Sequence, residues 1–189
     1  MGITLILLGI CVVALIYSVS LYNNLVSIKH EVSKAWANID VLLKQRHDEL
    51  PKLVEVCKQY KQFEQETLQR VIAARSQVQT AREGQDIAAL GKAEGMMRTS
   101  LSGLFAVAEA YPELKTNEQF MQLQTRISGL ENGIADRREF YNDAVNIYNV
   151  GIEQFPAVLI ANMFAYIAKP LLEVAAAEKT DVDIKALFS

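Results

Sequence analysis

The sequence predicts an all-α protein, with an N-terminal transmembrane helix, an antiparallel four-helix bundle, and a C-terminal apolar helix with a short extended tail. Two observations predict this fold class. All 19 basic and 22 acidic residues follow Ile28, so the chain opens on a stretch without any charged side chain. Beyond it, apolar residues recur every three or four positions, which is the period of an amphipathic helix and not of a strand.

The apolar run from Ile3 to Leu21 fits a membrane-spanning helix. As a helix it would be about 28 Å long, close to the ~30 Å hydrocarbon thickness, and Tyr22 would lie at the interface. A cleavable signal peptide is the alternative, since residues 18–20 loosely fit a small-x-small cleavage site. However, no Lys or Arg precedes the run, and the helical pattern continues through that site. We therefore expect residues 1–22 to be an uncleaved anchor.

Four helical segments are predicted to form the bundle. Their breaks lie near Asp48, at Gly84 and at Tyr111-Pro112, and Asn117 is expected to cap the last segment. Segments of similar length pack well side by side. The expected segments are roughly 26, 32, 25 and 34 residues long.

Pro51 is the ambiguous point in this interpretation. It either kinks one helix of about 90 Å or marks a corner between two helices. Length matching favours a corner, with Asp48 as the cap and Pro51 in the tolerant first turn. Arg46 and His47 would then suit the C-terminal end of the preceding helix. Gly151 is expected to stop the fourth helix.

Chain length, net charge and cysteine content limit the possible domain organisation and chemistry. Residues 23–154 are expected to form one bundle domain, and residues 155–189 the apolar helix and tail. A net charge of −3 provides no basic field for nucleic acid. Cys11 and Cys57 are interpreted as small buried hydrophobes and not as a disulfide.

The motifs of enzymatic chemistry are missing from the sequence. A bundle di-iron site needs Glu-x-x-His on two helices, and neither His30 nor His47 has a Glu three residues before it. There is no CxxC, HExxH, GxSxG or phosphate loop. We therefore expect no enzymatic activity, no catalytic or metal-binding residues and no cofactor.

Two sets of residues are predicted to shape the bundle. Glycines spaced four apart indicate close helix packing between the third and fourth helices, or room for a second subunit; these are Gly91, Gly95, Gly129 and Gly133. Polar residues spaced seven apart indicate a buried network that fixes helix register, with a recognition or proton-sensing site around His47 as the alternative. The polar set is Asp40, His47, Tyr141, Asn142, Tyr148 and Asn149.

A second uncharged run extends from Phe155 to Ala168. It is short for a membrane span, so it could close the bundle, lie in the membrane interface or contact another subunit. The residues predicted to make an assembly or membrane contact are Phe155, Pro156, Ile160, Met163, Phe164 and Ile167. The tail at 181–188 alternates apolar and charged residues, which is typical of a short strand or extended arm.

Long motifs throughout the chain resemble the LemA family. They are Tyr22-Asn23-Asn24-Leu25-Val26, Ala35-Trp36-Ala37-Asn38-Ile39-Asp40-Val41, Arg46-His47-Asp48, Tyr111-Pro112-Glu113-Leu114-Lys115, Glu131-Asn132, Tyr141-Asn142, Tyr148-Asn149 and Phe155-Pro156. The resemblance implies a bacterial protein with one N-terminal anchor helix, a helical-bundle domain and no established enzymatic activity. It also implies two contexts in which relatives occur: beside membrane metalloproteases, and in the biogenesis of magnetosome membranes.

Together these observations predict a membrane-anchored scaffold that self-associates and organises partners or the membrane. The alternative is an adaptor or sensor that presents its bundle to a membrane metalloprotease or signalling partner. The expected partners are the lipid bilayer and further copies of the chain. The expected location is the bacterial inner membrane in a single pass, with the bundle in the cytoplasm because Lys29 and Lys34 follow the anchor.

Overall fold

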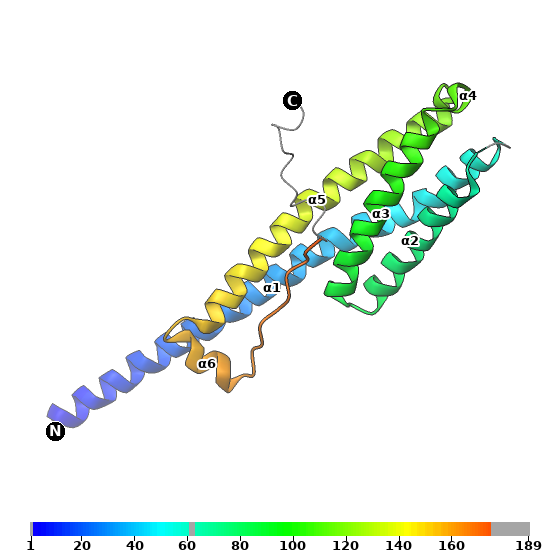
Figure 1. Cartoon of the computed structure of the whole chain (residues 1–189). Helices are drawn as coiled ribbons and strands as arrows, with labels where there is room; N and C mark the ends of the chain where they lie inside the picture. Colours follow the sequence, from blue (N-terminus) through cyan, green and yellow to red (C-terminus); the bar gives the residue numbers. More distant parts are fainter. Residues whose placement is uncertain (1, 61–62, 175–189) are drawn as a thin grey trace, which may run out of the picture. The chain divides into compact units, whose positions relative to one another are not determined.

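The protein is described by a computed structural model that covers residues 2–60 and 63–174 (Figure 1). The residues described there form helices and no strands, which confirms the all-α class. The helices are α1 (Gly2–Lys58), α2 (Gln65–Glu83), α3 (Ile87–Ala108), α4 (Pro112–Lys115), α5 (Glu118–Glu153) and α6 (Ala157–Met163). The tail predicted at 181–188 lies outside the described residues.

The chain divides into two compact units. Among the described residues, unit 1 contains 2–38 and 137–171, and unit 2 contains 39–60, 63–136 and 172–174. Unit 1 thus holds the first part of α1, the end of α5 and α6. Unit 2 holds the rest of α1, all of α2, α3 and α4, and the start of α5. The sequence-based division at residues 22 and 154 stays a prediction.

In unit 1, α1 and α5 run antiparallel. Trp36 packs edge-on against Tyr141 with ring centroids 5.9 Å apart, whereas Ile28 lies against Gly151. The contacts therefore move towards the start of α1 as α5 proceeds towards its end. The buried positions recur at helical spacing, which is why each helix turns one apolar stripe to the other; they include Leu25, Val32, Val145, Tyr148 and Ile152.

In unit 2, α2 and α3 form a helical hairpin (Figure 1). The turn lies where Gly84 predicts it, although the left-handed residue is Gln85, with a φ of 51°. Asp86 then caps α3, because its carboxylate accepts a hydrogen bond from the Ala89 backbone N–H at 2.9 Å. The buried stripes of the hairpin are Leu68, Val71, Ala74 and Val78 on α2 and Leu90, Ala93, Met97, Leu101 and Leu104 on α3.

The corner predicted near Asp48 is wrong, because α1 continues through Pro51 to Lys58. Proline lacks a backbone N–H, so the carbonyl of His47, four residues earlier, loses its helical partner. The Arg75 side chain supplies the missing donor, with its Nε 3.0 Å from that carbonyl oxygen. The chain instead turns after Lys58, and α2 begins at Gln65.

The ends of α5 match one sequence prediction and contradict another. Asn117 is the predicted cap, and its side-chain oxygen accepts a hydrogen bond from the Phe120 N–H at 3.0 Å. Gly151 does not stop the helix, which continues to Glu153. Its missing side chain makes room for Ile28, whose Cδ1 lies only 2.6 Å from where a Cβ would stand.

The C-terminal apolar helix is shorter than the predicted run of 155–168. Only Ala157–Met163 is helical, and Ala165 adopts a left-handed φ of 53° that ends the regular structure. Residues 166–171, called the strap here, then contain no helix, strand or turn. The strap forms because side chains of α5 hydrogen-bond its backbone, as described below.

Substitutions of two helical glycines test this packing. A Cβ at Gly91 would lie 1.9 Å from the Glu173 carbonyl oxygen, whereas a Cβ at Gly129 would meet nothing within 4 Å. We expect Gly91→Ala to destabilise the protein by about 1–3 kcal/mol, since backbone must move. Gly129→Ala should instead stabilise it by up to ~1 kcal/mol through helix propensity.

The measurement is the unfolding midpoint of both variants in detergent, followed by circular dichroism. Equal changes in the two midpoints would contradict the described approach of Glu173 to Gly91.

Candidate membrane anchor and interaction surfaces

The start of α1 is the candidate membrane anchor. It is long and apolar enough to cross a membrane by length and composition, and none of that stretch is buried inside the protein. Its large apolar side chains from Ile3 to Val19 are each at least half exposed. Such a surface is costly in water and is matched by the hydrocarbon of a bilayer.

A polar group in this stretch is satisfied within the helix. The Ser18 hydroxyl donates to the Ala14 carbonyl oxygen at 2.8 Å, which is the pattern that lowers the cost of a hydroxyl in lipid. The candidate anchor therefore does not depend on water at this position.

The interior of unit 2 contains a buried ion triad. The Arg46 side chain on α1 is 1% exposed and pairs with Glu94 on α3, which is 7% exposed. It also pairs with Glu131 on α5. Burial by itself lowers the pKa of Arg46, but the charges and hydrogen bonds of the two carboxylates outweigh it and raise that pKa above its ordinary value.

Sequence reasoning missed this triad, because it assigned Arg46 to a helix end. A signal was present in the spacing. Arg46 follows Leu43 by three residues and precedes Leu50 by four, so it occupies the apolar stripe itself. A basic residue in that stripe requires buried acidic partners.

Asp40 and His47, predicted as parts of one polar network, each pair with an arginine of α2. Asp40 accepts hydrogen bonds from Arg82 at 2.5 and 3.1 Å, and these lower the pKa of the Asp40 carboxyl. The His47 Nε2 lies 2.6 Å from Arg75 Nη2. Because a guanidinium only donates, His47 accepts here as the neutral imidazole.

The environment of His47 lowers its pKa. Burial contributes most, followed by the charge of Arg75, and Arg82 adds to the effect. Asp48 and Glu83 act in the opposite direction but do not outweigh it. Arg75 therefore contacts the neutral imidazole ring of His47 and also donates to the backbone carbonyl oxygen of the same residue.

The other predicted polar residues lie on α5 in unit 1. Tyr148 donates its hydroxyl to the Ile167 carbonyl oxygen at 2.9 Å, and Tyr141 donates to the Pro170 carbonyl oxygen at 3.3 Å. Asn149 both donates to and accepts from the backbone of Lys169, each at 2.9 Å. These side chains hold the strap; Asn142, the remaining predicted member, lies between them in sequence on the same helix.

The predicted glycines do not share one role. Gly91 is covered by the Glu173 backbone, and a Cβ added at Gly133 would lie 3.3 Å from the Leu42 side chain of α1. Close packing of the third and fourth helices at Gly133 stays a prediction. Gly129 faces open space, and Gly95 lines a surface pocket described below.

Cys57 is fully buried, and burial raises its pKa to about 12. A thiol with this pKa stays neutral and is a poor nucleophile. Cys11 is exposed on the candidate anchor, and both cysteines are free.

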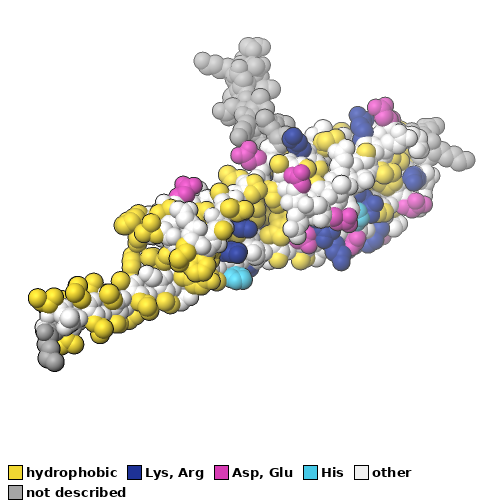
Figure 2. Space-filling view, turned by 90° about the horizontal axis from the view of Figure 1, so that it is seen from below, with side chains coloured by type: hydrophobic (Ala, Val, Ile, Leu, Met, Phe, Trp, Pro, Cys, Tyr) yellow, Lys and Arg dark blue, Asp and Glu magenta, His cyan; other side chains and the backbone are white. Residues whose placement is uncertain are grey.

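Apolar side chains beside α6 are exposed. Those of Phe155, Met163, Phe164 and Ile167 are between 51% and 81% exposed, whereas Ile160 is buried. Pro156 is half-buried at the start of α6. Figure 2 shows that hydrophobic side chains along the anchor continue onto the wider region next to it.

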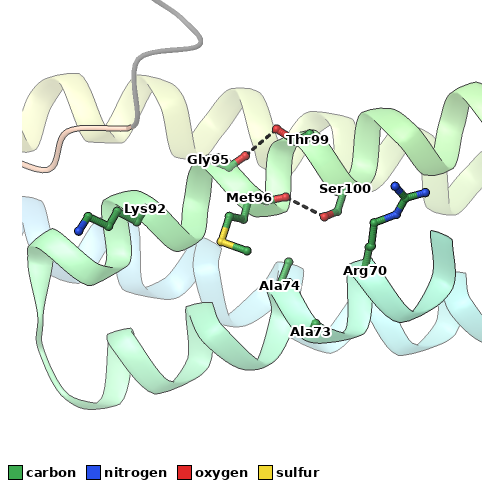
Figure 3. Close-up of a pocket in the computed structure, with 8 residues that line it drawn as sticks. All are labelled: Arg70, Ala73, Ala74, Lys92, Gly95, Met96, Thr99 and Ser100. Carbon is green, nitrogen blue, oxygen red and sulfur yellow. Dashed lines mark hydrogen bonds between the residues drawn. The ribbon is translucent and has the colours of Figure 1, made fainter. Parts of the chain in front are cut away.

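A surface pocket of about 410 Å³ lies between α2 and α3 (Figure 3). Ala73 and Ala74 line it from α2, and Gly95 and Met96 line it from α3. The ring of lining residues carries basic and neutral groups and no carboxylate or imidazole; it comprises Arg70, Ala73, Ala74, Lys92, Gly95, Met96, Thr99 and Ser100. Among residues 2–60 and 63–174, no group of three or more His, Cys, Asp or Glu could hold a metal ion.

Fold and surfaces together define a class: an all-α protein whose one apolar N-terminal helix continues into a packed helical body. The model of the LemA family matches residues 35–186, so the chain belongs to the LemA family. The resemblance seen in the sequence is thereby confirmed.

Named relatives agree with this assignment. The protein LemA of Metamycoplasma hominis is 26% identical over 166 residues, which cover 87% of this chain and 74% of that protein. The magnetosome proteins MamQ 1 and MamQ 2 of Paramagnetospirillum magneticum are each 24% identical over 158 residues, or 71% of this chain. The chain spans only 58% of the length of these two MamQ relatives.

The state of His47 predicts a pH dependence of stability. Because the folded pKa is lowered, the unfolded chain binds a proton more readily just below the ordinary value of about 6.5. The contribution of neutral His47 to the free energy of unfolding is therefore fully present above that pH. It decreases as the pH falls towards the pKa of His47 in the folded protein. Between about pH 7.5 and about pH 5.5, His47→Gln should lose less thermal stability than the wild type.

His30→Gln is the matched control, since His30 is exposed and the chain has only these two histidines. An identical loss in the wild type and the His47 variant would show that His47 is not held neutral by the fold.

Proposed function

We propose that the protein is a non-enzymatic scaffold, anchored in a bacterial inner membrane by a single pass, that self-associates and organises partners or the bilayer. The observation that carries the proposal is the continuity of α1. One helix begins with an uncharged, exposed run and proceeds into the packed part of unit 1. No Pro or Gly lies between Ile10 and Pro51, so the anchor has no sequence-encoded hinge before the folded body.

The state of the ionisable groups supports a non-enzymatic role. Arg46 is occupied by two carboxylates, His47 by Arg75, and Cys57 is a neutral buried thiol. A catalytic base or nucleophile needs access to a substrate. The pocket between α2 and α3 is lined by none of these groups.

The same pocket supports self-association. The small side chains of Ala73, Ala74 and Gly95 would allow a helix of a second copy to approach closely, and Met96, which also lines the pocket, is 49% exposed. The MamQ relatives are named magnetosome proteins, and the family resemblance implies magnetosome membrane biogenesis as a context, which supports a role in organising a membrane. Lys29 and Lys34, which follow the anchor, favour a cytoplasmic body.

An adaptor is the second candidate function, and the pocket favours it as well. An apolar recess on the surface can receive a side chain of a different protein, such as a membrane metalloprotease, as readily as that of a second copy. The two functions differ in the mass of the isolated particle.

Light scattering of the full chain in mild detergent tests the proposal. We expect a particle of several copies across micromolar concentrations. Ala73→Glu places a charge in the pocket and should reduce the particle to a monomer. Ala88→Glu is the matched control, because Ala88 is also an exposed helical alanine but does not line the pocket, so this variant should keep the mass.

A wild-type chain that is monomeric throughout would contradict the scaffold and favour the adaptor. A multimer that persists in Ala73→Glu would keep the scaffold but exclude this pocket as the contact.

A further inference from the structure

A group of exposed apolar side chains in unit 1 stands apart from the bundle core. Glu153 is the last charged residue before Lys169, so the intervening stretch is entirely uncharged. Several of its large side chains nevertheless point outwards, with Phe155 81% and Ile167 76% exposed. We call the exposed members the shoulder: Phe155, Leu159, Met163, Phe164 and Ile167.

The shoulder lies where the anchor ends. Phe164 packs against Tyr22 with ring centroids 4.7 Å apart, and Tyr22 is the residue at which the apolar run of α1 gives way to Asn23 and Asn24. A run from Ile3 to Tyr22 is about 30 Å long and fills the hydrocarbon layer, which places this contact at its edge. The shoulder is therefore continuous with the lipid-facing surface of the anchor.

Two pairs of a tyrosine ring and a lysine lie next to the shoulder, further from the anchor. The Lys29 ammonium lies 5.4 Å from the centroid of the Tyr166 ring, and that of Lys169 lies 5.7 Å from the Tyr148 ring centroid. Lys29 is seven residues, or about 10 Å, beyond Tyr22 along α1. Tyrosines with nearby lysines are typical of the headgroup level of a membrane.

The strap keeps the shoulder facing outwards. Tyr148 and Asn149 of α5 hydrogen-bond the backbone of Ile167 and Lys169 on the far side of α6. Within α6 itself, Ile160 and Ala161 are buried and hold the helix against the rest of unit 1. The shoulder therefore cannot turn its side chains inwards without breaking these contacts.

We propose that the shoulder is immersed in the interfacial layer of the same bilayer that holds the anchor, as a second membrane contact that fixes how unit 1 meets the membrane. This proposal rests on the membrane anchor of the proposed function. A bilayer is favoured over a second copy of the chain as the occupant because the shoulder continues the surface of the anchor and carries no charge.

The test uses single tryptophans in the full chain, reconstituted into phosphatidylcholine vesicles. Trp36→Phe removes the native tryptophan, and three variants in that background each add one: Ile10→Trp in the anchor, Phe155→Trp in the shoulder and Phe140→Trp on α5. Phe140 is a matched control, because it is also an exposed phenylalanine of unit 1, at 59%, but lies beside Arg137. It is about 20 Å from the end of α5.

We expect lipids brominated near the headgroup end of their chains to quench Phe155→Trp at least twofold more than Phe140→Trp. Lipids brominated near the chain ends should quench Ile10→Trp most. Acrylamide in the water should quench Phe140→Trp and spare Phe155→Trp.

The experiment distinguishes failure of the shoulder contact from failure of the anchor. If Ile10→Trp is quenched by the lipids but Phe155→Trp only by acrylamide, the shoulder lies in water and the proposal is wrong while the anchor stands. If Phe155→Trp escapes both quenchers, a second copy covers the shoulder, which also overturns the proposal. If Ile10→Trp is not quenched by brominated lipid, the anchor and the shoulder contact fail together.

Discussion

The buried guanidinium of Arg46 is the constraint on which unit 2 depends. A charge moved into a protein interior costs several kcal/mol unless its partners are close and well oriented. Here the partners come from two other helices, so the pairing with Glu94 and Glu131 fixes α1, α3 and α5 relative to one another within unit 2. An apolar core of the same volume could match the stability, but it would leave the register of these helices less defined.

The same logic accounts for two further sets of polar contacts. Arg75 satisfies the His47 carbonyl oxygen that Pro51 leaves without a donor, and this allows α1 to continue through a proline. In unit 1, Tyr148 and Asn149 satisfy the backbone of the strap. Polar side chains thus define the geometry of both units. The exposed surfaces to which we assign a function are the anchor, the shoulder and the pocket.

Much of the fold could be predicted from local patterns. The helical period, the cap at Asn117 and the turn at Gly84 all depend on neighbours in sequence, and the structure bears them out. The uncharged run lies in a helix that is long and apolar enough to cross a membrane. Pro51 and Gly151 were misread because their effects depend on distant partners, Arg75 and Ile28. Likewise, the strap replaces the end of a predicted helix because α5 supplies hydrogen bonds that a local pattern does not contain.

The candidate surfaces were predictable to different degrees. Uncharged composition revealed the anchor and the run containing Phe155 and Phe164, but not that Phe164 meets Tyr22, which requires the turn after α5. The ion triad left a signal, a basic residue on an apolar stripe, but its partners could not be chosen among the 22 acidic residues. Spacing identifies a face of one helix and not the residue that lies opposite.

Arg46 and Glu94 act as one buried unit. A double-mutant cycle tests it most directly, with Arg46→Met, Glu94→Met and the double variant measured by urea unfolding of the full chain in detergent. Arg46→Met should cost about 3–5 kcal/mol, because it leaves the buried Glu94 carboxylate unpaired. Glu94→Met should cost less, since Arg46 keeps its pair with Glu131, and the double change should cost clearly less than the sum of the two. Lys34→Met is the control, since its pair with Glu31 is exposed and should contribute under ~1 kcal/mol. Additive costs, or single changes no larger than the control, would contradict the account.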